Sequence, residues 1–294
     1  MNYFLSPLNS VKIAYDVFPA VKEKGRVLFL TGRAEYYLKY RHFFNILNEK
    51  GFSVYAMDHR GQGGSGRLLK EHQKGHVEKF DDFVEDADFF LKNLVIPGSA
   101  PSSELISISH SMGGAVSLLL GMKNPGIFKK MIFCSPMWGI NFGKIPECVI
   151  YRLSQLFCYL GAGERYALGK GDFNFDHPFE NNGLTHDPEK FGEQRSFLKE
   201  NPEFLLGGPT NRWAFESVKM IRKLKSIPVN TGSDVLLIQA GADPVVSSFH
   251  QNSIIQKMDR STKITIENSW HELLFEEKTI YSQAVDHIVK FVES

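Results

Sequence analysis

The sequence has few cysteines, no long apolar run and almost no net charge. Its 3 cysteines, Cys134, Cys148 and Cys158, are too few for a disulfide framework and match no zinc-site spacing. A reducing, cytoplasmic location is therefore expected. No apolar run is long enough to cross a bilayer. The first residues lack the basic start and apolar core of a secretory signal, so we expect none.

The charge balance argues against a nucleic-acid partner. Lys and Arg number 34 against 33 Asp and Glu, for a formal net charge of +1, and no basic excess is available for phosphate backbones. The 43% hydrophobic and 23% charged fractions are those of a globular protein. A chain of 294 residues can bury a sizeable core in one or two domains.

The stretch SISHSMGG, residues 107–114, predicts a nucleophile. It follows the pattern of a strand, a sharp turn and a helix, which lifts the hydroxyl of a central serine, here Ser111, clear of the backbone. Small residues are needed on both sides because strand and helix nearly touch. The usual G-x-S-x-G pattern has Ser109 in its first glycine position, a residue that is small but carries a Cβ.

Alternating strand and helix patterns predict an α/β fold with a mostly parallel sheet covered on both faces. Residues 11–18 read as an edge strand and 97–103 as a surface loop. The other predicted strands are 26–30, 52–57, 105–108, 130–134, 234–239 and 263–266, and the predicted core helices are 36–50, 80–94, 247–258, 279–292 and one beginning at Gly113.

The alternation of strand and helix patterns is interrupted between residues 137 and 228. This region holds short helical patterns separated by Gly, Pro and Asn, and no convincing buried strand. We therefore expect residues 1–136 and 229–294 to form the core, and residues 137–228 to be a helical cap inserted over the sheet. The helical patterns of this cap are 149–160, 188–200 and 210–224.

Two further residues complete a candidate catalytic triad with Ser111. Asp243 follows the strand at 234–239, and His271 follows the strand at 263–266. A serine hydroxyl needs a positioned base that is oriented by an acid, and both residues come at the carboxyl ends of strands. Taken alone, Asp243 could equally be a residue that forms a turn, and His271 could equally be an exposed loop residue. Their order along the chain favours the triad.

Attack on an ester produces an oxyanion that backbone N–H groups must receive. We expect these groups to belong to Met112, which follows the nucleophile, and to Arg33, which follows the strand at 26–30. The Arg33 side chain is expected in solvent, with contact to a substrate phosphate as the alternative. The glycine-rich loop at 58–66 lacks a phosphate-binding motif and reads as a structural turn.

No metal or organic cofactor is predicted. His72 and His76 have the spacing of helical metal ligands, but Gly75 intervenes and no third ligand is evident. Both histidines are therefore expected to be solvated loop residues.

Several longer segments resemble the α/β-hydrolase superfamily, in its monoacylglycerol lipase and lysophospholipase branch. They are TGRAEYYLKY, DHRGQGGSGRLL, GHVEKFDDFVEDADFF, ISHSMGGA, QAGADPVV, LLGGPTNRW and WHELLFE. The resemblance extends from about Val27 onward and implies the same triad and the same two backbone donors. Thr31 replaces the histidine that many relatives have before the oxyanion glycine, which leaves the backbone role intact.

The resemblance implies a serine hydrolase that releases a free fatty acid from a lysophospholipid through an acyl-enzyme. A monoacylglycerol lipase, a broad carboxylesterase or an acyltransferase is the alternative, and a catalytically silent binding protein on the same fold is the rival from another class. Peripheral contact with the bacterial inner membrane is also implied, and no oligomeric state is predicted. The cap aromatics expected to shelter an acyl chain, or to form the cap's own core, are Phe157, Phe173, Phe175, Phe179 and Trp213.

Overall fold

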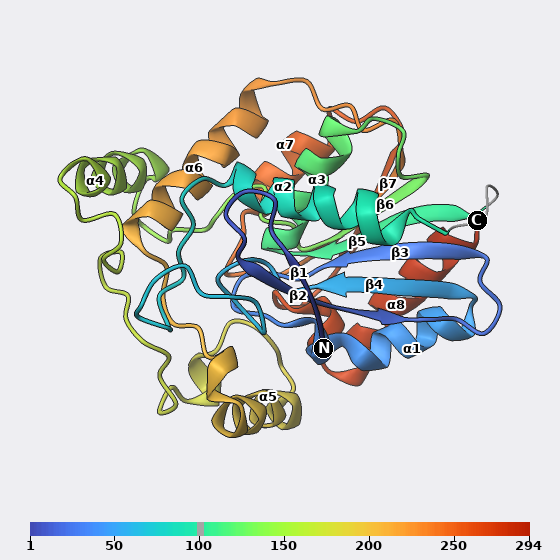
Figure 1. Ribbon diagram of the computed structural model, residues 1–294, viewed down its shortest axis with the longest axis horizontal. Coiled ribbons are helices and arrows are strands. Elements are labelled where there is room, and N and C mark those ends of the chain that lie inside the picture. Colours follow the sequence, from blue (N-terminus) through green and yellow to red (C-terminus); the bar gives the residue numbers. More distant parts are fainter. Residues whose placement is uncertain (99–102) are drawn as a thin grey trace.

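The computed structural model describes residues 1–98 and 103–294. Within these residues, one eight-stranded sheet passes through the molecule with helices on both faces (Figure 1). The strand order is β1-β2-β4-β3-β5-β6-β7-β8; β1–β2 and β2–β4 are antiparallel pairs and the remaining pairs are parallel. The strands are β1 (Asn2–Leu5), β2 (Lys12–Phe18), β3 (Gly25–Leu30), β4 (Phe52–Met57), β5 (Glu104–His110), β6 (Lys130–Cys134), β7 (Asp234–Ala240) and β8 (Ser261–Ile266).

The helices lie in two layers around this sheet. In Figure 1, α1 and α8 cover one face, whereas α2, α3 and α7 cover the other. The α-helices are α1 (Arg41–Glu49), α2 (Asp81–Phe90), α3 (Met112–Lys123), α4 (Glu147–Tyr159), α5 (Pro188–Glu200), α6 (Asn211–Ser226), α7 (Ser248–Ile255) and α8 (Lys278–Glu293). Short 3-10 segments are η1 (Tyr37–Tyr40), η3 (Phe179–Asn181), η4 (Pro202–Phe204) and η5 (Leu273–Phe275), and a π-helical turn, η2 (Leu91–Val95), extends α2.

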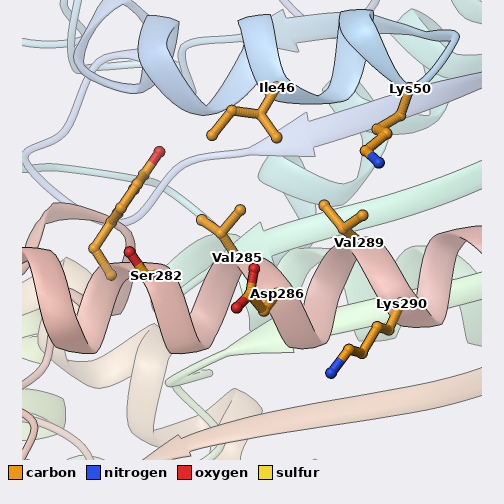
Figure 2. Close-up of a pocket in the computed structure, with 8 residues that line it drawn as sticks. Ile46, Lys50, Ser282, Val285, Asp286, Val289 and Lys290 are labelled. Atoms are coloured by element: carbon orange, nitrogen blue, oxygen red, sulfur yellow. The ribbon is translucent and has the colours of Figure 1, made fainter.

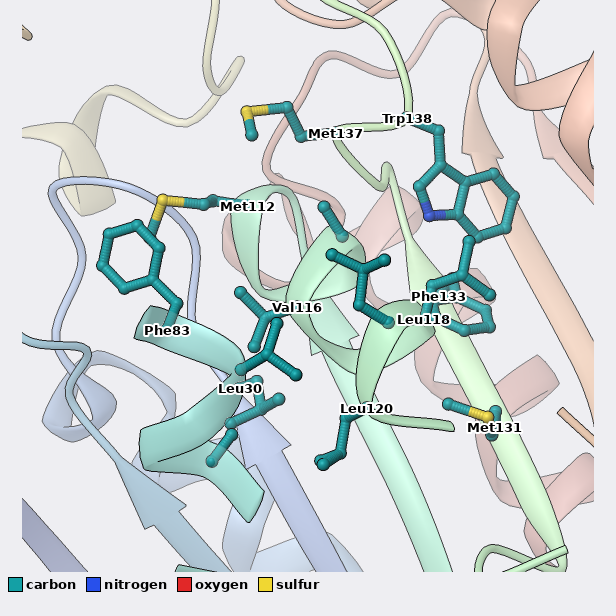
Figure 3. Packing of buried hydrophobic residues seen from close by; sticks show 14 of the residues in the cluster. Leu30, Phe83, Met112, Val116, Leu118, Leu120, Met131, Phe133, Met137 and Trp138 are labelled. Carbon is teal, nitrogen blue, oxygen red and sulfur yellow. The ribbon is translucent and has the colours of Figure 1, made fainter. Parts of the chain in front are cut away.

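The central strand β3 shows how the two layers arise. Every residue of β3 is buried, because a parallel strand in the middle of such a sheet is covered on both faces. Val27 and Phe29 pack with α1 and α8, whereas Leu28 and Leu30 pack with α2 and α3. Figure 3 shows the second layer, in which Leu30 lies beside Val116 of α3.

Helices α1 and α8 leave a groove between them of about 380 Å³. Figure 2 shows Ile46 of α1 pointing toward Val285 and Val289 of α8, with Lys50, Asp286 and Lys290 around them. None of its lining residues belongs to the predicted site.

The predicted α/β fold is confirmed, with two local differences. Residues 11–18 were expected at the edge of the sheet, but β1 pairs outside β2, so that prediction is wrong. The helix expected at 36–50 is divided into η1 and α1. Of the loop expected at 97–103, residues 99–102 lie outside the described residues.

The segment between β6 and β7 contains α4, α5 and α6 and, in the part of the chain described, no strand. Helix α4 packs along α6, where Tyr151 meets Phe215 and the Glu147 carboxylate pairs with Arg222 and Lys225. Over residues 1–98 and 103–294, no helix has the length and apolarity needed to cross a membrane.

Candidate active site

Ser111 lies in a strained turn between β5 and α3. Its φ of 49° and ψ of −117° are rare for a residue with a side chain. Its carbonyl oxygen accepts hydrogen bonds from the N–H groups of Met137, at 2.8 Å, and Gly114, at 2.9 Å, which hold the turn. The side chain is therefore fixed at the carboxyl edge of the sheet, as the sequence pattern predicts.

Small residues let α3 approach the sheet at this point. A Cβ on Gly113 would lie 2.2 Å from the carbonyl oxygen of Leu30, so only glycine fits. On the strand side, Ser109 is fully buried, and its hydroxyl donates to the carbonyl oxygen of Ile132 at 3.3 Å. The extra atoms of Ser109, compared with glycine, are thus accommodated without an unpaired polar group.

The three predicted triad side chains form a hydrogen-bonded row. Ser111 Oγ lies 2.8 Å from Nε2 of His271, and Nδ1 of the same ring lies 2.8 Å from Oδ2 of Asp243. Asp243 comes from the loop after β7 and His271 from the loop after β8. All three are nearly covered, and Ser111 is 8% exposed.

The Asp243 carboxylate is prepared to hold a histidine. Its Oδ1 accepts hydrogen bonds from the N–H groups of Val245, at 2.8 Å, and Val246, at 3.0 Å, leaving Oδ2 for His271. Burial alone raises the pKa of this carboxyl, but the hydrogen bond and charge of His271 and the two N–H groups lower the pKa below its usual value. Asp243 is therefore ionised at neutral pH.

The two expected oxyanion donors are free to bind. In the described part of the chain, neither the N–H of Arg33 nor that of Met112 has a hydrogen-bond acceptor. The preceding Gly32 is fixed instead: its N–H donates to the Glu35 carboxylate, and its carbonyl oxygen accepts from Gln62 Nε2 at 2.6 Å. These contacts fix the loop on which the Arg33 amide lies.

A buried ionic network beneath this loop was not predicted from the sequence. The Glu35 carboxylate lies 2.9 Å from Nδ1 of His110, and Nε2 of His110 donates to the carbonyl oxygen of His271 at 3.1 Å. Lys39 lies 2.7 Å from the Glu272 carboxylate and 3.7 Å from that of Glu35. The network thus joins the loop of the expected oxyanion donor to the loop of His271.

The network keeps its charges. Although burial raises the pKa of the Glu35 carboxyl, His110 and Lys39 hold it well below its usual range. Burial lowers the pKa of His110, but the Glu35 charge outweighs burial and raises it above its usual value. An acid two residues after Arg33 and a histidine just before Ser111 were the available sequence signals.

The glycine-rich loop at 58–66 is held as a turn by the Asp58 side chain. Its carboxylate accepts from the N–H groups of Tyr37, at 2.7 Å, and Gly64, at 2.8 Å. A Cβ on Gly63, whose φ is 54°, would lie 2.3 Å from Oδ2 of Asp58. The predicted structural role of this loop therefore agrees with its contacts.

Two predictions about exposure are wrong. His72 is exposed, but His76 is buried, and its Nδ1 lies 3.0 Å from the Thr210 hydroxyl. The Arg33 side chain is also only partly exposed, with its Nε buried and Nη2 donating to the carbonyl oxygen of Gly207. Both errors have one cause, because residues 207–210 cover this part of the core, with Pro209 pairing with Gly75.

A second contact joins the inserted segment to the core beside His271. The fully buried Glu276 carboxylate accepts from Nδ1 of His186 at 2.7 Å, from the N–H of His186 at 2.8 Å and from the N–H of Trp270 at 3.0 Å. The centres of the His186 and Trp270 rings lie 3.9 Å apart. Residues 185–186 are thereby fixed to the loop that carries His271.

The aromatic residues of the insertion divide between two environments. Phe173 and Phe175 pack against a cluster that contains Tyr36 of the core and Phe204 of the insertion, and so lie where the insertion meets the core. Trp213 belongs instead to the large core cluster that also contains Met112, and its ring centre lies 5.3 Å from Cζ of Arg33. Across residues 1–98 and 103–294, no group of three His, Cys, Asp or Glu side chains is arranged to hold a metal ion.

The fold and this arrangement of side chains define the molecule as an α/β hydrolase. A family model described as serine aminopeptidase, S33, matches residues 21–278, and the chain belongs to this family. It is accordingly an enzyme of the carboxylic ester hydrolase class.

Three relatives show how far the similarity extends. Lysophospholipase L2 of Escherichia coli K12 is 30% identical, over 97% of this chain and 85% of that protein. Monoacylglycerol lipase of Mycolicibacterium smegmatis is 31% identical, over 48% of this chain and 49% of that protein. The crystal structure of a soluble variant of monoglyceride lipase from Saccharomyces cerevisiae superposes with a TM-score of 0.78 at 17% identity, covering 99% of this chain and 93% of that one, which shows the shared fold.

Proposed function

We propose that this chain is a lysophospholipase, which hydrolyses the acyl ester of a lysophospholipid and releases a free fatty acid. The observation that carries the proposal is the hydrogen-bonded row of Ser111, His271 and Asp243, beside two backbone N–H groups that have no acceptor among the described residues. The similarity to lysophospholipase L2 along nearly the whole chain supports the substrate class.

The geometry supports the following first half-reaction. Ser111 Oγ attacks the ester carbonyl carbon while His271 Nε2 takes the hydroxyl proton. Asp243 holds the imidazole in the required tautomer and stabilises its cation. The N–H groups of Arg33 and Met112 receive the oxyanion, each such donor contributing roughly 10²–10³ in kcat. When the tetrahedral intermediate collapses, His271 returns the proton to the leaving glycerol oxygen.

In the second half-reaction, His271 takes a proton from water, and the resulting hydroxide attacks the acyl-Ser111 carbonyl. Collapse releases the fatty acid and returns the proton to Ser111. An alcohol in place of water would give acyl transfer, because the acyl-enzyme does not dictate which nucleophile attacks it.

Residues 137–228 serve in this proposal as a cap over a core made of residues 1–136 and 229–294. The low exposure of Ser111 supports this role, as do the contacts of residues 185–186 and 207–210 with the core.

The proposal also includes peripheral contact with a lipid surface through α4. Apolar side chains spaced three or four residues apart follow one another along this helix and the residues flanking it, and all are exposed. They are Ile145 (51%), Val149 (41%), Leu153 (40%), Leu156 (49%) and Leu160 (65%). Leu153→Asp should reduce co-sedimentation with phospholipid vesicles, whereas Val21→Asp, at a fully exposed site outside this face, should not.

The main experiment measures fatty-acid release by the wild type and by Ser111→Ala. The substrates are lysophosphatidylcholine, lysophosphatidylethanolamine and monoacylglycerol with the same acyl chain. We expect release from the lysophospholipids by the wild type and a loss on the order of 10⁴–10⁶ in kcat in the variant. Release from monoacylglycerol alone would contradict the lysophospholipase proposal and support the second candidate function, that of a monoacylglycerol lipase. The similarity to the Mycolicibacterium relative favours this second candidate.

A fluorophosphonate probe separates an enzyme from a binding protein on the same fold. The probe forms a covalent bond with an activated serine, so the wild type should be labelled and Ser111→Ala should not. A folded wild type that stays unlabelled would contradict the enzymatic proposal.

A further inference from the structure

The guanidinium of Arg33 lies between the core and the cap. Its Nη2 donates to the carbonyl oxygen of Gly207, and its Cζ lies 5.3 Å from the centre of the Trp213 ring. Gly75 makes room for it, since a Cβ there would lie 2.6 Å from Nη2. The residue that supplies a backbone N–H to the candidate oxyanion site therefore also holds a cation in place nearby.

Within residues 1–98 and 103–294 this cation has no anionic partner: no carboxylate lies within 4.0 Å of the Arg33 guanidinium, and its Nε is buried without a hydrogen bond. Burial lowers the pKa of Arg33 to about 10, so the group remains charged at neutral pH. Tyr166, the neighbour that acts on it electrostatically, is neutral there, because burial and Asp172 hold the pKa of its phenol well above the usual value.

Two other buried cations each have a carboxylate partner. Arg60 lies 2.6 Å from the Asp86 carboxylate, and Lys39 pairs with Glu272. The half-buried Arg67 has no carboxylate within 4.0 Å among the described residues, but it uses each of its three nitrogens. They donate to the carbonyl oxygens of Gly63, Ser65, His72, Glu203 and Leu205. Arg33 differs because its Nε is unused and its charge is not balanced.

The position of this charge fits a particular part of the substrate. A Cβ on Gly32 would lie 3.0 Å from the Cβ of Ser111, so Arg33 begins beside the nucleophile. In a lysophospholipid, the glycerol places only a few bonds between the ester carbonyl and the phosphorus. That distance is comparable to the length of an arginine side chain. Arginine binds phosphate oxygens well because its planar fork presents parallel donors.

We infer that the Arg33 side chain binds the phosphodiester of the lysophospholipid head group while its own backbone N–H faces the oxyanion. This inference rests on the proposed function and deepens it: one residue selects an anionic head group and contributes to ester hydrolysis. A monoacylglycerol has the same ester but no phosphate, and so lacks this contact.

The test compares kcat/KM for lysophosphatidylcholine with kcat/KM for monoacylglycerol of the same acyl chain. Arg33→Gln keeps the backbone amide, and we expect it to lower the ratio of the two values by roughly 10- to 100-fold, as for loss of a charged hydrogen bond. Arg33→Lys should give a smaller decrease, because it keeps the charge without the fork. The matched control Arg67→Gln should leave the ratio unchanged, since its donors are already used.

The outcomes are distinguishable. If Arg33 only ties the cap to the core, both substrates lose activity equally, and an unchanged ratio overturns the inference while the proposed function stands. A wild type that does not hydrolyse lysophosphatidylcholine overturns both. The ratio is unaffected by a uniform loss of folded protein.

A measurement on the wild type alone covers the case in which the variants do not fold. Glycerophosphocholine should competitively inhibit monoacylglycerol hydrolysis, and glycerol should not. Inorganic phosphate is tested as a third inhibitor in the same assay. Inhibition by inorganic phosphate without inhibition by glycerophosphocholine would assign Arg33 to free phosphate and overturn the head-group inference, as would no inhibition by either.

Discussion

Glu35 and His110 form a buried ion pair, with 2.9 Å between the carboxylate and Nδ1. The carboxylate also holds the N–H of Gly32, and the other ring nitrogen of His110 holds the carbonyl oxygen of His271. One ion pair therefore sets the distance between the expected oxyanion loop and the expected general base.

Removing the Glu35 charge should destabilise the protein. We expect Glu35→Gln to lower the free energy of unfolding by about 3 kcal/mol, the lower end for a broken buried pair. The lower end applies because Lys39 keeps Glu272 as a partner and His110 can lose its proton. Urea unfolding measures the change, and Glu49→Gln, at an exposed site, should change it by less than about 0.5 kcal/mol. Equal effects of the two substitutions would contradict a structural role for the pair.

The same pair predicts a pH dependence. The folded-state pKa of His110 is raised above 6.5, so its stabilising contribution is complete below that pH and is lost as pH rises through the folded-state pKa. Glu35 also raises the pKa of Asp58, which burial raises to about 7, and of His59, which burial lowers to about 4, and through both groups its stabilising effect becomes smaller as pH rises through those values. The difference in unfolding free energy between the two proteins should therefore shrink as pH rises above 6.5. A difference that stays constant or grows would show that His110 is not charged by Glu35.

The close approach of α3 to the sheet predicts the effect of a single methyl group. Gly113→Ala should cost about 3 kcal/mol, the upper end for overpacking, because the new Cβ would meet the backbone oxygens of Leu30, at 2.2 Å, and Thr31, at 2.5 Å. Gly192→Ala in α5 is the matched control. A Cβ at residue 192 would have no atom within 4 Å, so this substitution should raise the free energy of unfolding by about 0.5–1 kcal/mol. Thermal unfolding distinguishes the two, and a neutral Gly113→Ala would mean that strand and helix are further apart.

Asp243→Asn should preserve the fold and lower kcat by roughly 10⁴. The side-chain oxygen can still accept from Val245 and Val246, but the amide nitrogen would face Nδ1 of His271 and favour the wrong tautomer. Single-turnover hydrolysis measures the loss, with the exposed Asp259→Asn as control. Full activity of Asp243→Asn would assign the orienting acid to another residue.

The fold was predictable because each central strand is a short apolar run that ends in small or polar residues. Such runs identify buried parallel strands whatever their neighbours are. Residues 2–5 offered no such signal: in β1 only Phe4 is buried, and the strand exists because it pairs with β2. The assignment of residues 11–18 to the edge failed for this reason.

The positions of Ser111, Asp243 and His271 were predictable because each follows a strand of the same sheet, which brings 111 and 271 together across 160 positions. The environment of Arg33 and His76 was not. Arg33 meets Gly207 across 174 positions, and His76 meets Thr210 across 134, where no periodic pattern links the partners. Contacts between two irregular segments depend on the tertiary fold and leave no local signature.

Two of the places where the insertion is fastened to the core affect how a fatty acyl chain can enter. Residues 185–186 are held at Glu276 and residues 207–210 at Gly75, so the stretch with α5 is secured at both ends, whereas the contacts described for α4 are with α6. We expect amide hydrogen exchange in α4 to occur through local opening at a lower free energy than in residues 185–187 and 207–210. Entry of the chain on the α4 side would then leave Arg33 and its contact with Gly207 undisturbed throughout a catalytic cycle.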